Sequence, residues 1–112
     1  MEARKELKEI KCPVGVAHNV ISGKWKLVII WILKDNVKRF NELQKALPGI
    51  RQSYLTQQLR ELEKDGLVYR EVYKEVPPKV EYSLTDIGRE FLKVMDRMYE
   101  WGEAYMAFIE NQ

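Results

Sequence analysis

The sequence is poor in the residues that build most catalytic and metal centres. It contains one cysteine, Cys12, and one histidine, His18. A single thiol cannot close a disulfide within the chain, and these two side chains are too few ligands for a structural zinc site. Glycine motifs that bind phosphates or dinucleotides, or that hold a nucleophilic serine, do not occur. We therefore expect no enzyme, no metal and no cofactor, and we expect His18 to be a structural or surface residue.

Long apolar runs are also missing. The longest, Leu27 to Leu33, has seven residues, whereas a membrane-spanning helix needs roughly 20. Residues 1–13 alternate in charge and contain no apolar stretch like that of a signal peptide. Because a lone thiol also suits a reducing compartment, these absences predict a cytoplasmic protein that makes no contact with membranes.

The net charge is small. Lys and Arg number 19 and Asp and Glu 17, which gives a formal charge of +2. Any case for nucleic-acid binding must therefore come from where the charges lie. The 112 residues, 46% hydrophobic and 32% charged, have the size and composition of one globular domain. We expect a single domain over residues 1–112, in which residues 1–11 form an N-terminal extension.

Three helices are expected in the first half of the chain, over residues 14–22, 24–34 and 40–47. Gly23 separates the first two, because glycine readily leaves the helical region. The second segment is apolar nearly all round. Its β-branched residues would also allow a strand, but its length and flanking lysines favour a buried central helix. Asn41 is the expected cap of the third helix, and residues 37–39 can form a very short strand.

The second half predicts a helix over residues 52–65, a β-hairpin over 67–84 and a long helix over 85–110. Leu55, Leu59 and Leu62 recur at helical spacing, and Gly66 follows as a stop. The next residues alternate as in strands, and Thr85 caps the last helix. The predicted fold class is mainly α with a small β-hairpin: a winged helix-turn-helix domain, in which the second helix of the motif enters the major groove.

The expected recognition helix has an apolar and a polar face. At 100° per residue its three leucines lie together, and most of its polar side chains lie opposite them. The residues that we expect to contact DNA here are Arg51, Gln52, Ser53, Thr56, Gln57 and Arg60. Gln57 can pair with adenine, and Arg60 with guanine or a phosphate. Alternatively this is an ordinary solvated face, an interpretation that Glu61 and Glu63 favour because they weaken its positive potential.

The hairpin contains three basic positions, Arg70, Lys74 and Lys79, with acidic residues mixed among them. We expect Lys74 and Lys79 to reach the DNA backbone or the minor groove as part of a wing. Lys79 is the best placed of these, because it adjoins the Pro77-Pro78 turn. The alternative is a charged edge strand that is protected from aggregation.

Several short motifs, in the right order, resemble the HxlR-type transcriptional regulators, a MarR-like group of small winged-helix proteins in bacteria and archaea. They include Cys12-Pro13-Val14, Gly23-Lys24-Trp25-Lys26, Leu55-Thr56-Gln57-Gln58-Leu59, Val76-Pro77-Pro78-Lys79 and Glu100-Trp101-Gly102. The resemblance implies a homodimeric regulator, a repressor by default, that places two recognition helices on a pseudo-palindromic operator in double-stranded DNA. It also implies a dimer interface built from the N-terminal helix and the long C-terminal helix.

The composition of the last predicted helix supports this dimerisation role independently. It carries more aromatic and methionine side chains than one face of a small domain needs, and such a surplus suggests a partner. The expected interface residues are Phe91, Met98, Trp101, Tyr105 and Phe108. Alternatively, some of them pack within the chain against Trp25 and Trp31.

Cys12 precedes Pro13 at the start of a helix and follows Lys11. The helix dipole and the lysine would favour the nucleophilic thiolate. The resemblance strengthens this expectation, since some members of the group use the cysteine at this place to sense quinones, aldehydes or oxidants. Since the chain lacks a second cysteine, an adduct or a Cys12–Cys12 bond between subunits would be the product. The alternative is a small buried side chain.

A rival hypothesis from another class is a winged-helix interaction module that binds protein and not DNA. The basic residues Arg51, Arg60, Lys74 and Lys79 argue against it, whereas the small net charge favours it. Substitution separates the two hypotheses: Gln57→Ala would change the sequence preference of a DNA-binding protein, and Lys79→Ala would weaken its binding to all DNA.

Overall fold

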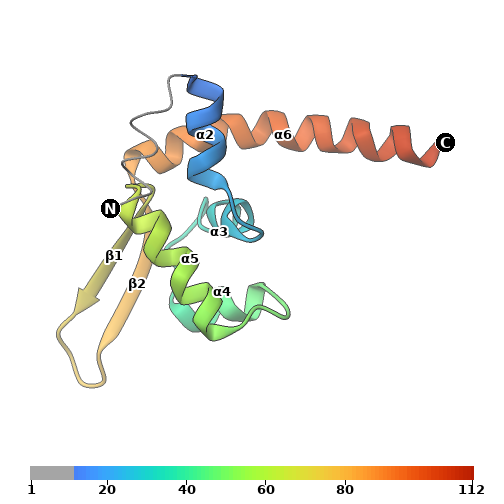
Figure 1. Cartoon of the computed structure of the whole chain (residues 1–112). Coiled ribbons are helices and arrows are strands. Elements are labelled where there is room, and N and C mark those ends of the chain that lie inside the picture. Colours follow the sequence, from blue (N-terminus) through green and yellow to red (C-terminus); the bar gives the residue numbers. More distant parts are fainter. Residues whose placement is uncertain (1–11) are drawn as a thin grey trace.

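The computed structural model describes residues 12–112, so the expected extension over residues 1–11 lies outside the described chain. Its elements are α2 (Pro13–Ile21), α3 (Lys26–Ile32), α4 (Phe40–Ala46), α5 (Gln52–Lys64), β1 (Val68–Tyr73), β2 (Lys79–Leu84) and α6 (Asp86–Glu110) (Figure 1). This order confirms the predicted fold class, which is mainly helical with one hairpin. Within residues 12–112, no helix combines the length and apolarity that crossing a bilayer requires.

The leucine stripe of α5 forms the centre of the core. Leu55, Leu59 and Leu62 are 0–1% exposed and pack in one cluster with Ile29 and Ile30 of α3. Burying a leucine or isoleucine side chain stabilises a fold by about 1.5–3 kcal/mol. This burial therefore fixes which face of α5 points outward, which is the face that the sequence analysis predicted.

The hairpin is antiparallel, and its register pairs Val68 with Leu84 at the base and Tyr73 with Lys79 near the tip. The short strand expected over residues 37–39 is a single bridge. The backbone N–H of Lys38 donates to the carbonyl of Tyr82 at 2.9 Å, and the N–H of Tyr82 donates back at 2.8 Å. This bridge attaches the loop before α4 to the base of the hairpin.

Two helix N-termini differ from prediction, one in its first residue and the other in its cap. Helix α3 begins at Lys26, two residues later than expected, because the chain turns at Gly23 with φ +138°, where most side chains are disfavoured. The expected cap Asn41 is wrong, since it lies inside α4. The N-terminus of α4 is satisfied instead by Glu42, whose carboxylate accepts a hydrogen bond from the backbone N–H of Arg39 at 2.8 Å.

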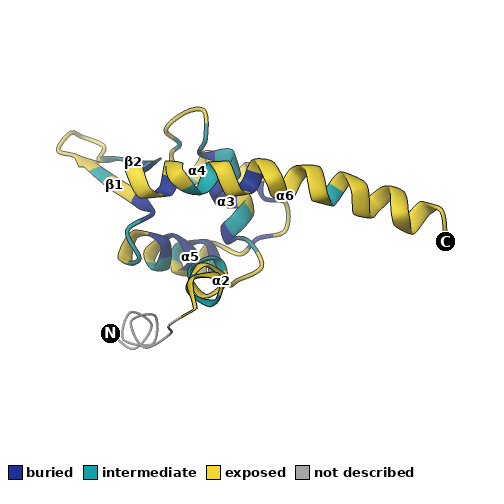
Figure 2. Ribbon diagram, turned by 90° about the horizontal axis from the view of Figure 1, so that it is seen from above, coloured by how far each residue is buried: buried dark blue, intermediate teal, exposed yellow. Residues whose placement is uncertain are grey.

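Thr85 joins the hairpin to α6. Its Oγ1 accepts a hydrogen bond from the N–H of Gly88 at 3.1 Å and donates one to the carbonyl of Gly66, just after α5, at 2.5 Å. Gly88 lies so close to the backbone of Leu67 that a Cβ would overlap its carbonyl oxygen. Met95 is the last buried residue of α6, and beyond Tyr99 the helix projects away from the other elements and is exposed over most of its surface (Figure 2).

Candidate nucleic-acid interface

The outward face of α5 carries most of the residues that were predicted to contact DNA. Ser53, Gln57 and Arg60 are exposed on it, and Gln52 is exposed in its first turn. Arg51 is exposed and occupies the N-cap position of the helix. Free N–H groups at a helix N-terminus, together with a nearby guanidinium group, favour a phosphate there.

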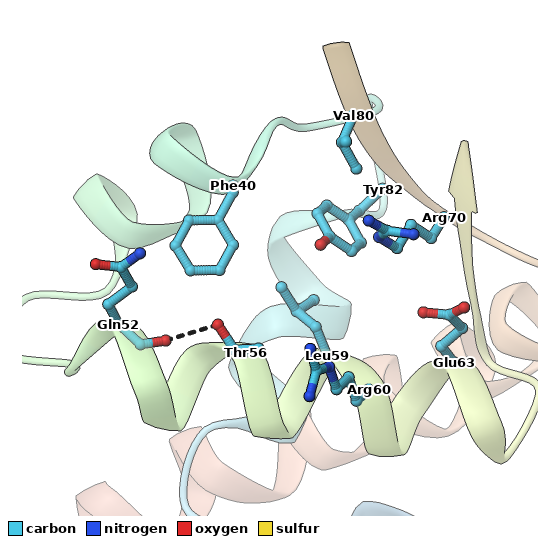
Figure 3. Close-up of a pocket in the computed structure, with 9 residues that line it drawn as sticks. All are labelled: Phe40, Gln52, Thr56, Leu59, Arg60, Glu63, Arg70, Val80 and Tyr82. Atoms are coloured by element: carbon cyan, nitrogen blue, oxygen red, sulfur yellow. Dashed lines mark hydrogen bonds between the residues drawn. The ribbon is translucent and has the colours of Figure 1, made fainter. Parts of the chain in front are cut away.

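A cleft of about 510 Å³ separates α5 from the hairpin (Figure 3). It is lined by Phe40, Gln52, Thr56, Leu59, Arg60, Glu63, Arg70, Val80 and Tyr82. The hydroxyl of Thr56 donates a hydrogen bond to the carbonyl of Gln52 at 2.9 Å. Thr56 thus lies on the flank of the recognition face that looks into the cleft, and its oxygen keeps acceptor capacity.

Two arginines line this cleft from its two sides. Arg60 comes from α5, and Arg70 comes from β1, where it pairs with Tyr82 across the hairpin. Neither arginine forms an ion pair with a residue in the described range. Arg70 was not among the contacts expected from the sequence. The strand register predicts its position, because side chains directly opposite each other, such as those of Arg70 and Tyr82, share one face of a hairpin.

The two wing lysines lie in different surroundings. Lys74 is exposed in the loop after β1 and forms no ion pair with the part of the chain that the structure describes. The Nζ atom of Lys79 lies 3.4 Å from Oε2 of Glu81 and 4.9 Å from the ring centre of Tyr73. Lys79 is therefore held against the hairpin, which leaves Lys74 with more freedom to reach outward.

The charge of Glu61 is compensated from within the fold. Its Oε1 lies 2.5 Å from Nζ of Lys26, and this bond lowers the pKa of the Glu61 carboxyl below its ordinary value. Glu61 therefore weakens the positive potential of this face much less than its charge alone suggests. Glu63 remains as an acidic side chain in the cleft.

Cys12 is exposed at the N-cap of α2, contrary to the alternative of a small buried side chain. Hydrogen bonds from the backbone N–H groups of Gly15 and Val14 lower the pKa of the thiol, as a helix N-terminus does to a cysteine. Lys11, to which the prediction gave part of this effect, lies outside the described residues. His18 is exposed on the same helix.

The outer part of α6 carries a ladder of aromatic side chains. The rings of Trp101 and Tyr105 stack at 5.0 Å between centres, and those of Tyr105 and Phe108 at 5.9 Å. These three residues and Met98 are 41–67% exposed. Phe91 differs, because it is partly buried against the core of its own chain.

Packing within the chain accounts for a further aromatic residue of α6. Tyr99 stacks on Trp31 of α3 at 6.1 Å. Gly102 lies in the middle of the exposed part of the helix, and apart from its chain neighbours and the helix backbone no atom lies within 4 Å of where a Cβ would stand. No group of three or more His, Cys, Asp or Glu side chains within residues 12–112 is placed to hold a metal ion.

Comparison with known proteins finds a family model described as HxlR-like helix-turn-helix that matches residues 20–110. The chain is 55% identical over 100 residues to the HTH-type transcriptional regulator YdeP of Bacillus subtilis, covering 89% of this chain and 78% of that protein. It is 48% identical over 103 residues to an HTH-type transcriptional regulator of Methanothermobacter thermautotrophicus, covering 92% and 79%. Among solved structures it resembles the redox regulator HypR in its reduced form, with a TM-score of 0.85, 50% identity, and coverage of 90% and 100%.

Proposed function

The chain belongs to the HxlR-like helix-turn-helix family, and from this premise we propose that it is a sequence-specific regulator of transcription that binds double-stranded DNA. We propose that it acts in the cytoplasm as a homodimeric repressor on a pseudo-palindromic operator. Helix α5 enters the major groove, and the wing formed by β1 and β2 lies on the backbone or in the adjacent minor groove. Two subunits place two such helices in successive major grooves.

The observation that carries this proposal is the pair of arginines in the cleft between α5 and the wing. Arg60 and Arg70 come from the two elements that would straddle one DNA strand, and no residue in the described chain neutralises them through an ion pair. A phosphate between them would receive charge-assisted hydrogen bonds from both. Arg51, at the start of α5, can bind a second phosphate.

Sequence reading falls to the polar side chains of α5. The amide of Gln57 has the donor and acceptor that match N7 and N6 of adenine, whereas Ser53 and Thr56 offer hydroxyl groups. Gln52 lies in the first turn, where recognition helices commonly meet base edges. Lys74 and Lys79 of the wing would add contacts to the backbone that do not depend on sequence.

The proposed dimer uses the projecting part of α6. Met98, Trp101, Tyr105 and Phe108 are exposed there as one apolar and aromatic surface, and a small protein rarely leaves such a patch uncovered. Phe91 contributes less, because its own core already covers part of it. A second copy of the chain that packs the same surface in a two-fold arrangement would bury both ladders.

Fluorescence anisotropy with purified protein tests DNA binding directly. The DNA is a duplex selected by this protein from a random pool, compared with a scrambled duplex at several salt concentrations. We expect preference for the selected duplex, and affinity that falls with salt because bound phosphates release counterions. Replacing Arg60 or Arg70 by alanine should in each case reduce the salt slope by about one. Lys93→Ala, at an exposed position of α6 that pairs with Glu90, should leave the slope unchanged.

Equal or absent binding to both duplexes would contradict the proposal. It would favour the alternative, a winged-helix interaction module that recognises protein and not DNA. The small net charge of +2 is the observation on that side.

Regulation by a small-molecule or electrophile effector is proposed at Cys12. The exposed thiol and its lowered pKa favour attack by the thiolate on a quinone or similar electrophile. We expect a quinone to weaken binding of the wild-type protein to the selected duplex and to leave the Cys12→Ser variant unaffected. Equal loss in both proteins would remove Cys12 from the response.

A further inference from the structure

A buried lysine lies behind the recognition helix. Lys26, the first residue of α3, is only 4% exposed, and its Nζ lies 2.5 Å from Oε1 of Glu61 on α5. Lysine is almost never fully buried unless it is paired. Since the Glu61 side chain is itself 41% exposed, this ion pair runs from the interior of the domain to the surface that faces DNA in the proposed function.

The other oxygen of Glu61 continues the connection outward. Its Oε2 accepts a hydrogen bond from Nε2 of Gln57, one turn earlier on α5, at 3.1 Å. The three side chains therefore form a series from the buried ammonium group, through the carboxylate, to the exposed amide. Gln57 keeps its second N–H and its Oε1 available for another partner.

The position of Lys26 is itself fixed against α5. The preceding turn passes through Gly23, where a Cβ would stand 2.7 Å from Oε1 of Gln58 on α5. Gln58 is 3% exposed, and this oxygen has no hydrogen-bond partner among the described residues. The φ of +138° at Gly23 and its contact with this buried side chain both favour glycine, so the turn that leads into Lys26 lies against the Gln58 side chain of α5.

We propose that Glu61 is a positioning residue for sequence recognition: anchored by Lys26, it orients the amide of Gln57 toward the base that Gln57 reads. This inference rests on the proposed DNA-binding function. Adenine needs an N–H donor at N7 and an oxygen acceptor at N6 in fixed relative positions. A bond to Glu61 selects the orientation with Nε2 on the Glu61 side and removes rotamer freedom before DNA arrives, which reduces the entropy lost on binding.

The anchor also explains how an acidic residue is tolerated on this face. An uncompensated carboxylate beside Gln57 would repel the phosphates of an approaching duplex. Lys26 supplies the opposite charge from inside the fold, where it does not itself compete for the DNA. The pair thus provides a rigid acceptor for Gln57 with little net charge at the surface.

The test measures discrimination, which is the dissociation constant for a duplex with one base pair changed divided by that for the selected duplex. Both constants are measured with the full-length protein. Gln57→Ala first identifies the base pair that Gln57 reads. The decisive variant is Lys26→Met/Glu61→Ala, which removes both charges and leaves neither buried alone. At that base pair we expect discrimination to fall by about threefold or more, out of the roughly 5–150-fold that a bidentate pair supplies. Discrimination at other base pairs should not change.

A double-mutant cycle separates positioning from general support of the fold. In a Gln57→Ala background, Lys26→Met/Glu61→Ala should cause no further loss of discrimination, because the amide that it positions is gone. Glu61→Gln, which retains an oxygen acceptor, should preserve more discrimination than Glu61→Ala. Lys93→Met/Glu90→Ala removes a matched ion pair on α6 and should change neither quantity.

Three results would overturn the inference. They are unchanged discrimination in the Lys26→Met/Glu61→Ala variant, an equal loss at every base pair, and the same loss when Gln57 is already alanine. If the double variant does not fold, Glu61→Ala alone enters the same cycle. Failure of the proposed function would look different, because the wild-type protein would then bind the selected and scrambled duplexes equally.

Discussion

Helices α5 and α6 are both amphipathic, but their apolar faces end in different surroundings. Helix α5 has 13 residues and buries Leu55, Leu59 and Leu62 within its own domain. Helix α6 has 25 residues, of which only Gly88 and Met95 are buried, although its outer part is rich in aromatic residues. Helical spacing predicts that an apolar face exists, whereas it does not tell which molecule covers that face. The difference can be tested by substitution on each helix.

The largest effect on folding is expected in α5. Leu59→Ala leaves a cavity beside side chains that are fully buried, so the free energy of unfolding should fall by about 2–5 kcal/mol. Urea denaturation followed by circular dichroism, at a single protein concentration, measures the change. Val76→Ala, at a fully exposed position of the wing, is the control and should stay within about 0.5 kcal/mol of wild type. Equal stability of the two variants would contradict the assigned core.

On α6 the main effect should fall on association. Trp101 is 67% exposed in the described chain and stacks on Tyr105. If a second copy covers it, Trp101→Ala should weaken dimerisation by about 2 kcal/mol or more, as buried tryptophans at interfaces do. Sedimentation equilibrium over a range of concentrations measures the dissociation constant. Ile87→Ala, exposed in the first turn of the same helix, should have a smaller effect. A monomeric wild-type protein would refute this assignment.

Substitution at Thr85, where the hairpin joins α6, should lower the stability of the fold by an intermediate amount. Thr85→Ala removes the hydroxyl that bonds to both Gly88 and Gly66, and loss of a helix cap typically costs about 1 kcal/mol. Thermal unfolding should therefore show a lower melting temperature. Thr85→Ser retains the hydroxyl and serves as the control. Should Thr85→Ser lose as much stability as Thr85→Ala, the hydrogen bonds are not the cause.

The smallest effect concerns the outward face of α5 and depends on pH. The ion pair with Lys26 lowers the pKa of Glu61 from its ordinary value of 4.5. A lowered carboxyl pKa adds stability that is present above about pH 4.5 and is lost as the pH falls through the folded-state pKa. The stability difference between wild type and Glu61→Gln should therefore shrink on acidification. Unfolding curves between about pH 6 and 3 measure it, and a difference independent of pH would exclude the ion pair as its source.

Local patterns predicted much of this molecule. The leucines of α5, the strand alternation before and after Pro77-Pro78 and the cap at Thr85 each depend on residues close in sequence. They gave the elements, their order and the outward face of α5. The DNA contacts proposed for that face come from the same periodicity.

The features that could not be predicted from the sequence depend on contacts between segments that lie far apart along the chain. Lys26 was expected to flank a helix, and it is buried because Glu61, 35 positions later, meets it across the core. Arg70 faces the cleft because of the hairpin register. The burial of Phe91 and the exposure of Trp101 depend on where α6 leaves the domain, which periodicity along one helix does not encode.

The two hydrogen bonds of Thr85 have a mechanical consequence. Rotation of α6 about its first turn would break the bond to Gly66 at the end of α5, or press Gly88 into the backbone of Leu67. These contacts therefore couple the start of α6 to the C-terminal end of α5. Bending is easiest further along, near Gly102, where glycine weakens the helix by about 1 kcal/mol relative to alanine and no other segment of the described chain packs against its Cβ position. In a dimer held by α6, stiffness at that point would govern how far the spacing of the two recognition helices can adjust to the DNA.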